Sequence, residues 1–146
     1  EKEKTMKAII FHSLSKNQRS RKIAESIEGD HFEIIPNKKP PRTFFCQLFV
    51  YGYKTVADKP VGIEPLAIDY EKYEEIVLVS PVWAGRVNAF MRQFLRDYPF
   101  RGKKVTIISS SDGTNNNYFA SFESLIDPSN EIIEKQVYIK GNKINS

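Results

Sequence analysis

The chain has few of the residues that mark the most easily recognised protein classes. Its 146 residues include one cysteine, Cys46, which excludes internal disulfide bonds and is typical of a reducing compartment. No segment approaches the roughly 18 consecutive apolar residues that a membrane-spanning helix requires. The two histidines, His12 and His31, have no cysteine or carboxylate partners at metal-binding spacing, so we expect structural roles for both. These absences favour a cytoplasmic protein that binds neither membranes nor metals.

The composition is that of a globular protein with a substantial core. Hydrophobic residues make up 40% and charged residues 27% of the chain, which argues against disorder. The net charge is +4 and the pI is about 9.1, a mild excess that permits attraction to phosphate-bearing ligands. No nucleic acid is expected, because no aromatic–basic interleaving accompanies the charge. We expect one domain over residues 6–140, an extension (native or added) over 1–5 and a tail over 141–146.

Apolar segments with two different periodicities alternate along the chain. Short continuous apolar runs predict buried strands, and apolar residues at helical spacing predict amphipathic helices. The strands are expected at residues 6–12, 31–35, 75–80, 104–109 and 131–139. The helices are expected at residues 17–27, 43–51, 87–98 and 118–126. This alternation predicts a doubly wound α/β protein, with a five-stranded parallel sheet between two helical layers.

One covering element is missing from this pattern. Only residues 140–146 follow the last strand, too few and too polar for the helix that normally covers it. Either the chain is truncated, or a partner covers the sheet face. We favour a homo-oligomer that covers this face.

The only tryptophan lies where a central strand is expected to leave the sheet. Trp83 follows the apolar run of residues 76–79, with a proline and a glycine close by. Ligands of open parallel sheets bind outside the carboxyl ends of the strands. Trp83 is therefore placed either to stack on a flat ligand or to close the top of the core.

Two further loops are expected at the same edge. Residues 13–18 are rich in hydroxyl and amide side chains and lead into a helix, which suits either phosphate binding or ordinary N-capping. Residues 109–117 form a polar loop after the fourth strand.

These three loops together resemble the flavodoxin-like FMN proteins. Residues 11–18 are similar to the phosphate loop that follows the first strand of that family, residues 76–85 to its aromatic loop, and residues 109–113 to its polar loop after strand four. The resemblance covers residues 6–139 and implies strand order 2-1-3-4-5.

The resemblance implies FMN as cofactor and assigns its binding residues. The phosphate would be held by Ser13, Ser15, Lys16, Asn17 and Gln18. The ring would stack on Trp83, with its edge shaped by Pro81, Val82, Ala84 and Gly85. The pyrimidine side would be bordered by Ser110, Ser111, Asp112 and Gly113. No catalytic side chain is implied, because the flavin carries the electrons.

The resemblance implies electron transfer, or an FMN-dependent oxidoreductase that reduces a small acceptor. The donor would be NAD(P)H or a redox partner protein. An alternative is a cofactor-free interaction module, motivated by Lys16 and Gln18, which stand where the family usually has glycine and threonine. A third hypothesis is weak electrostatic binding of an acidic partner through the basic residues 16–22.

Other classes with similar architecture do not fit. A receiver domain needs aspartates at the ends of strands one and three, where this chain has His12-Ser13 and Ser80. A small phosphatase needs an arginine shortly after its cysteine, and none follows Cys46 within residues 47–52. A dinucleotide fold needs Gly-x-Gly-x-x-Gly after strand one, and this is absent.

Overall fold

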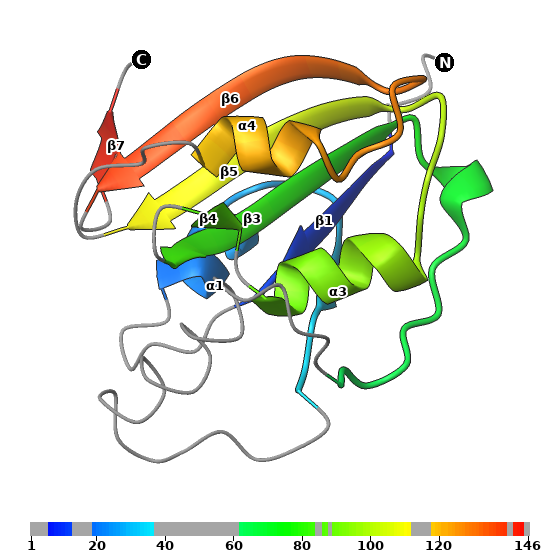
Figure 1. Ribbon diagram of the computed structural model, residues 1–146, viewed down its shortest axis with the longest axis horizontal. Helices are drawn as coiled ribbons and strands as arrows, with labels where there is room; N and C mark the ends of the chain where they lie inside the picture. Colours follow the sequence, from blue (N-terminus) through cyan, green and yellow to red (C-terminus); the bar gives the residue numbers. More distant parts are fainter. Residues whose placement is uncertain are drawn as a thin grey trace.

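A twisted sheet runs through the centre of the molecule (Figure 1). The computed structural model describes residues 6–12, 19–36, 62–83, 86–87, 89–111, 118–139 and 142–144. The strands are β1 (Lys7–Phe11), β2 (Asp30–Glu33), β3 (Glu75–Trp83), β4 (Arg86–Val87), β5 (Lys104–Ser111), β6 (Glu131–Ile139) and β7 (Asn142–Ile144). The helices are α1 (Arg19–Glu25), α3 (Ala89–Asp97), α4 (Tyr118–Glu123) and the short 3-10 turn η1 (Tyr70–Lys72).

Five strands of the sheet pair in parallel, in the order β2-β1-β3-β5-β6. Counted among themselves these strands have the order 2-1-3-4-5, so the expected doubly wound α/β architecture is confirmed. The strand expected at 131–139 is found with those bounds. The helix expected at 43–51 and Cys46 lie outside the described residues.

Two short antiparallel strands were not expected. The helix expected at residues 87–98 is found as α3, Ala89–Asp97, and residues 86–87 form β4, in which Val87 pairs with Val82 and Arg86 with Trp83. The branched side chain of valine favours this extended pairing over a helical turn. Within the expected tail, β7 turns back to pair with β6, so that Ile139 lies opposite Asn142.

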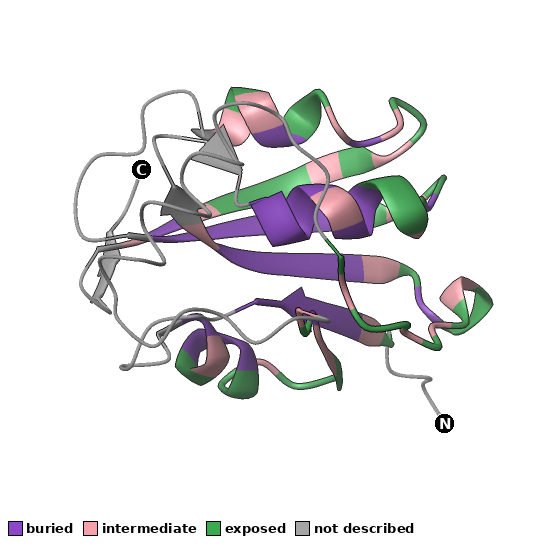
Figure 2. Ribbon diagram, turned by 60° about the horizontal axis from the view of Figure 1, so that its bottom comes forward, coloured by how far each residue is buried: buried purple, intermediate pink, exposed green. Residues whose placement is uncertain are grey.

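Helices pack on both faces of the sheet. One core joins alternate residues of the central strands to α3 and α4, with Phe90, Phe94 and Phe122 fully buried. The other core lies under α1, where Ile23 and Ala24 meet Ile9 and Val77. Figure 2 shows the central strands buried along most of their length between these layers. The apolar runs in the sequence arise because these strands are covered on both faces.

Polar side chains lie on the face of β6 that is on the α1 side of the sheet. The register of β6 places Glu134 and Gln136 beside Thr106 and Ile108, on the face covered elsewhere by α1. Gln136 donates a hydrogen bond to Glu134, which is exposed. The same strand also carries apolar side chains, since Tyr138 packs against the core under α1 and Ile133 is 43% exposed. Self-association stays a prediction.

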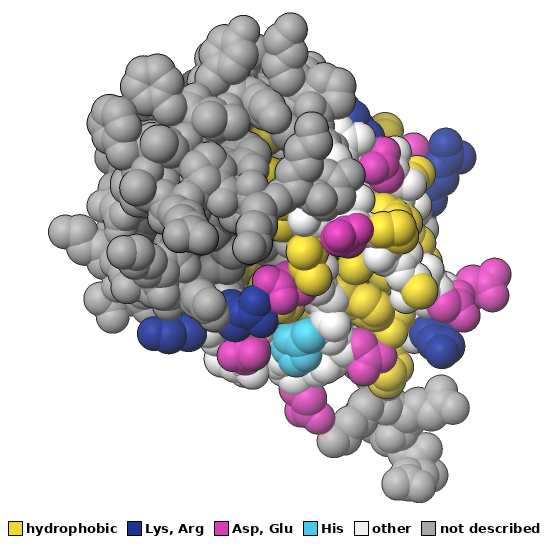
Figure 3. All heavy atoms as spheres, turned by 90° about the horizontal axis from the view of Figure 1, so that it is seen from below, with side chains coloured by type: hydrophobic (Ala, Val, Ile, Leu, Met, Phe, Trp, Pro, Cys, Tyr) yellow, Lys and Arg dark blue, Asp and Glu magenta, His cyan; other side chains and the backbone are white. Residues whose placement is uncertain are grey.

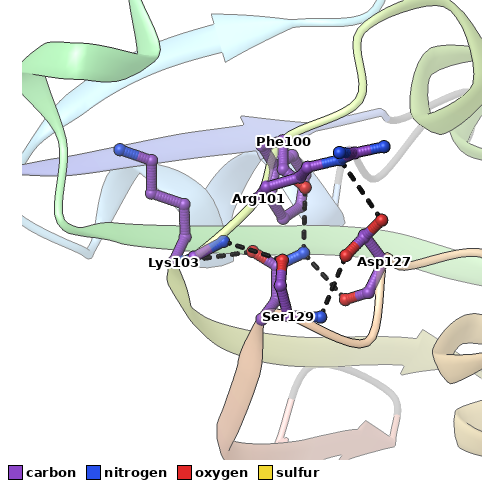
Figure 4. Close-up of polar contacts among 7 residues, drawn as sticks. Phe100, Arg101, Lys103, Asp127 and Ser129 are labelled. Carbon is purple, nitrogen blue, oxygen red and sulfur yellow. Dashed lines mark hydrogen bonds and ion pairs between the residues drawn. The ribbon is translucent and has the colours of Figure 1, made fainter.

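Polar contacts hold the amino edge of the sheet together (Figure 4). Asn130, in the turn before β6, accepts a hydrogen bond from the backbone N–H of Lys103 and donates to the carbonyls of Phe100 and Asp127. Arg101 forms an ion pair with Asp127, at 3.3 Å between Nε and Oδ2. The ammonium of Lys103 donates to two carbonyls of the η1 segment. These contacts fix the starts of β5 and β6 relative to one another.

Candidate ligand-binding site

The carboxyl ends of β1, β3 and β5 lie side by side in the middle of the sheet. The backbone N–H of His12 donates to the carbonyl of Val79, and Ser80 lies opposite Ser109. In the sheet, β2 lies next to one edge of β1, and β3 lies next to its other edge. This is a topological switch point, where the crossovers diverge and ligands of open parallel sheets bind.

Three polar residues form a row across these strand ends. Phe11 pairs with Val79, which brings His12 opposite Ser80, and Ser80 pairs with Ser109. By strand alternation all three project toward the α3 side, and the ring of His12 lies 4.7 Å from that of Phe90. Their exposed fractions are 1%, 0% and 0%. We call His12, Ser80 and Ser109 the polar row.

The histidine of the polar row is held neutral. Its Nδ1 donates to the carbonyl of Ile34 over 3.0 Å. Desolvation by burial lowers the pKa of His12 to about 4, against the smaller opposing effect of that hydrogen bond. At neutral pH the row therefore contributes no charge to the carboxyl edge.

The two serines differ in their partners. The hydroxyl of Ser80 donates to the carbonyl of Pro81 over 3.1 Å. The hydroxyl of Ser109 is buried and has no hydrogen-bond partner within the described part of the chain. Such a group costs about 1–3 kcal/mol when it is left unsatisfied. Ser109 therefore provides hydrogen-bonding capacity that the described protein groups do not use.

A cation lies behind the strand ends on the other face. Arg21 of α1 lies over the ring of Phe11 at 5.5 Å from the ring centroid, and it pairs with Glu33 at 2.5 Å. Its charge is thus largely compensated by Glu33. On the surface that Figure 3 shows, acidic, basic and apolar side chains are mixed among the described residues. Neither observation adds support to an acidic partner for residues 16–22.

The second histidine has a structural contact, as expected from the sequence. Nε2 of His31 donates to the carbonyl of Ala24, near the end of α1, over 2.7 Å. Within the described ranges, no three histidine, cysteine or carboxylate residues are grouped as a metal site would require. No described helix is long and apolar enough to cross a bilayer.

Comparisons with solved structures give the fold a name. A flavoprotein from Lactobacillus acidophilus NCFM, in complex with FMN, matches with a TM-score of 0.72 and 20% identity, over 92% of this chain and 93% of that one. The apo-form of the flavoprotein from that organism matches with a TM-score of 0.65 and 19% identity, over 94% and 95%. A protein from Bacteroides eggerthii DSM 20697 matches with a TM-score of 0.74 and 14% identity, over 92% and 88%. The chain has a flavodoxin-like fold. No protein-family model and no curated protein matches the sequence.

The flavodoxin-like fold brings two of the three expected loops together. Pro81 of β3 lies directly opposite Ser110 of β5, so the starts of the second and third loops are neighbours. Ser110 is buried. The strands β3 and β5 continue through Val82, Trp83 and Ser111, further than the expected ends at residues 80 and 109. Trp83 therefore belongs to a strand that pairs with β4, and not to a loop as the sequence indicated.

Most of the other expected ligand contacts lie outside the described residues. They are Ser13, Ser15, Lys16, Asn17, Gln18, Ala84, Gly85, Asp112 and Gly113. Of the residues that flank the first loop, residue 12 directly follows β1 and residue 19 begins α1. The roles assigned to these nine residues stay predictions.

No member of the polar row is expected from the sequence to contact a ligand. From the sequence, His12 is expected to have a structural role, and Ser80 and Ser109 are the first residues of two loops at the ligand-binding edge, but no ligand contact is assigned to either serine. The sequence does contain a signal for the two serines. Each stands two residues after a buried apolar residue, Leu78 or Ile107, so its side chain points to the same buried face of the strand. A polar residue at an inward position of a central strand is a candidate for function.

Proposed function

We propose that this protein binds FMN at the carboxyl edge of its sheet and uses it for electron transfer or for reduction of a small acceptor. The observation that carries the proposal is the buried, uncharged polar row at the switch point of a flavodoxin-like fold. A protein of the same fold has been crystallised with FMN, which supports this choice of ligand.

The described residues fit the ring of such a cofactor. Oxidised flavin presents an uncharged edge of carbonyl and N–H groups, and the polar row offers hydroxyls without a fixed charge. The Ser109 hydroxyl in particular is left without a partner by the described protein groups. Lysine, arginine and carboxylate side chains are absent from the row itself, so no unpaired charge would be buried beneath the ring.

The remaining roles follow the family resemblance. Residues 13–18 would hold the phosphate, Trp83 would stack on the ring, and Pro81 and Ser110 would border its edge. FMN would supply the redox chemistry, while the chain orients the ring and excludes water from it. We propose NAD(P)H or a redox partner protein as donor. A cytoplasmic location stays a prediction.

An FMN titration tests the proposal. The purified protein, freed of bound flavin, should quench FMN fluorescence at one equivalent and become yellow. Protein that stays colourless and leaves FMN fluorescence unchanged would favour the cofactor-free interaction module. If FMN binds, anaerobic addition of NADH or NADPH shows whether a nicotinamide reduces it directly, by loss of the visible absorbance.

A pair of variants tests the assignment of Trp83. Trp83→Ala removes an aromatic face worth roughly 1 kcal/mol, so the dissociation constant for FMN should rise about fivefold. Trp83→Phe keeps a stacking surface and serves as the matched control. Equal affinity of both variants and the native protein would remove Trp83 from the site.

A further inference from the structure

The polar row contains a hydroxyl that the protein buries without using. Ser109 is fully buried in a central strand, and its Oγ has no hydrogen-bond partner within the described residues. Of the other members, His12 donates through Nδ1 to the carbonyl of Ile34, and the hydroxyl of Ser80 donates to the carbonyl of Pro81. An unsatisfied hydroxyl in a central strand is a cost to folding, which alanine at the same position would avoid.

The position of Ser109 suggests what would satisfy it. It projects toward the α3 layer like Ile107, and it is the last residue on this side of β5 whose side chain the structure describes. Its cross-strand neighbours are Ser80 on β3 and Val137 on β6. No ionisable side chain is among them, and the one titratable group of the row, His12, is neutral at physiological pH. The strand neighbours of this hydroxyl thus offer no charge, which favours an uncharged partner that approaches from the carboxyl edge.

We infer that Ser109 is a binding residue whose hydroxyl hydrogen-bonds the uncharged polar edge of the flavin ring. The inference rests on the proposed function, and it adds a side chain from inside the core to contacts otherwise assigned to loops. The phosphate of FMN plays no part in this contact, since a phosphate requires compensating charge and the row has none.

This role predicts opposite effects of one substitution on the free and the flavin-bound protein. Ser109→Ala should leave the melting temperature of the flavin-free protein unchanged or raise it, because it removes an unsatisfied buried hydroxyl. The same substitution should weaken FMN binding about five- to tenfold, the value of one hydrogen bond. A hydroxyl with a purely structural role would give the reverse: a less stable flavin-free protein and unchanged FMN affinity.

Riboflavin identifies the part of the ligand that is contacted. Because riboflavin has the same ring without the phosphate, Ser109→Ala should weaken riboflavin and FMN binding by the same factor. Thr106→Val is the matched control, since it removes a buried hydroxyl from the same strand, on the opposite face and away from the carboxyl edge. It should leave both affinities unchanged.

The outcomes separate this inference from the proposed function. Failure of the native protein to bind FMN would refute both. Binding of FMN by the native protein, with the same affinity in Ser109→Ala, would refute the inference alone. A loss of affinity for FMN but not for riboflavin would also overturn it, because Ser109 would then act through the phosphate.

Discussion

Acidification should destabilise this protein through His12. The imidazole is 1% exposed, lies at the end of a central strand and packs on the ring of Phe90. Burial lowers its pKa from 6.5 to about 4. The unfolded chain therefore takes up a proton near pH 6.5, while the folded protein does so only near pH 4.

The sign and size of the effect follow from this difference. Between these two values the unfolded state binds more protons than the folded state, so the free energy of unfolding falls as the pH falls. The slope approaches about 1.4 kcal/mol per pH unit. Over the whole window the loss is roughly 3 kcal/mol, a large share of the 5–15 kcal/mol typical of a domain. The contribution of neutral His12 is fully present above pH 6.5 and is lost as the pH approaches 4.

The measurement is urea unfolding of the native protein and of His12→Asn at several pH values from 7.5 to 4. Asparagine keeps an N–H that can donate to the carbonyl of Ile34, and it does not titrate. Carboxylates titrate in both proteins, so the difference between the two curves isolates His12. We expect His12→Asn to be less stable at pH 7, because it loses the ring contact, and the gap to narrow by roughly 2–3 kcal/mol toward pH 4. Parallel curves would refute the reasoning.

Two matched pairs of substitutions test the fold by thermal or urea unfolding. Gly29→Ala would place a Cβ 2.4 Å from Ile9 Cδ1 at a residue with φ 149°, and should cost about 3 kcal/mol. Gly102→Ala, with φ 67° and open space around it, should cost only about 1 kcal/mol, and equal costs would contradict the packing argument. Lys103→Met loses two hydrogen bonds to backbone carbonyls and should lower the free energy of unfolding by roughly 1–3 kcal/mol. Lys104 is exposed, so Lys104→Met should change the free energy of unfolding by no more than about 0.5 kcal/mol. A Lys103 variant as stable as the Lys104 variant would show that these bonds contribute nothing.

The sheet was predictable because its strands carry a local signal. Ile76 and Leu78 of β3 lie in the core on one face and Val77 lies in the core on the other, an apolar run that a strand covered by two helical layers requires. Strand order is not local, and here it came from the family resemblance and was then found in the structure. The bounds of β6 were predicted closely because Pro128 and the turn before Glu131 delimit it.

The short antiparallel strands could not be predicted, since each depends on a partner. Residues 86–87 are one charged and one apolar residue, too short a segment to show a periodicity. They form β4 only because β3 extends to Trp83 and pairs with them. The same is true of β7, whose three residues pair with the end of β6. Hairpin pairing of so few residues is decided by tertiary contacts and not by propensity.

The candidate site shows why resemblance and residue-level reasoning find different parts of it. The family resemblance rests on loop motifs, so the ligand contacts that it implies are with residues in or near loops, such as Ser110. The strand register shows which residues lie beneath the loops. Ser80 and Ser109 are neighbours only because β3 and β5 are adjacent and their register pairs these two residues. A chain that needed these positions only for stability could place alanine or valine there, as the fold does at Val79 and Val105 nearby. The hydroxyl of Ser109 therefore supports our proposal that the ligand binds at the carboxyl edge of the sheet.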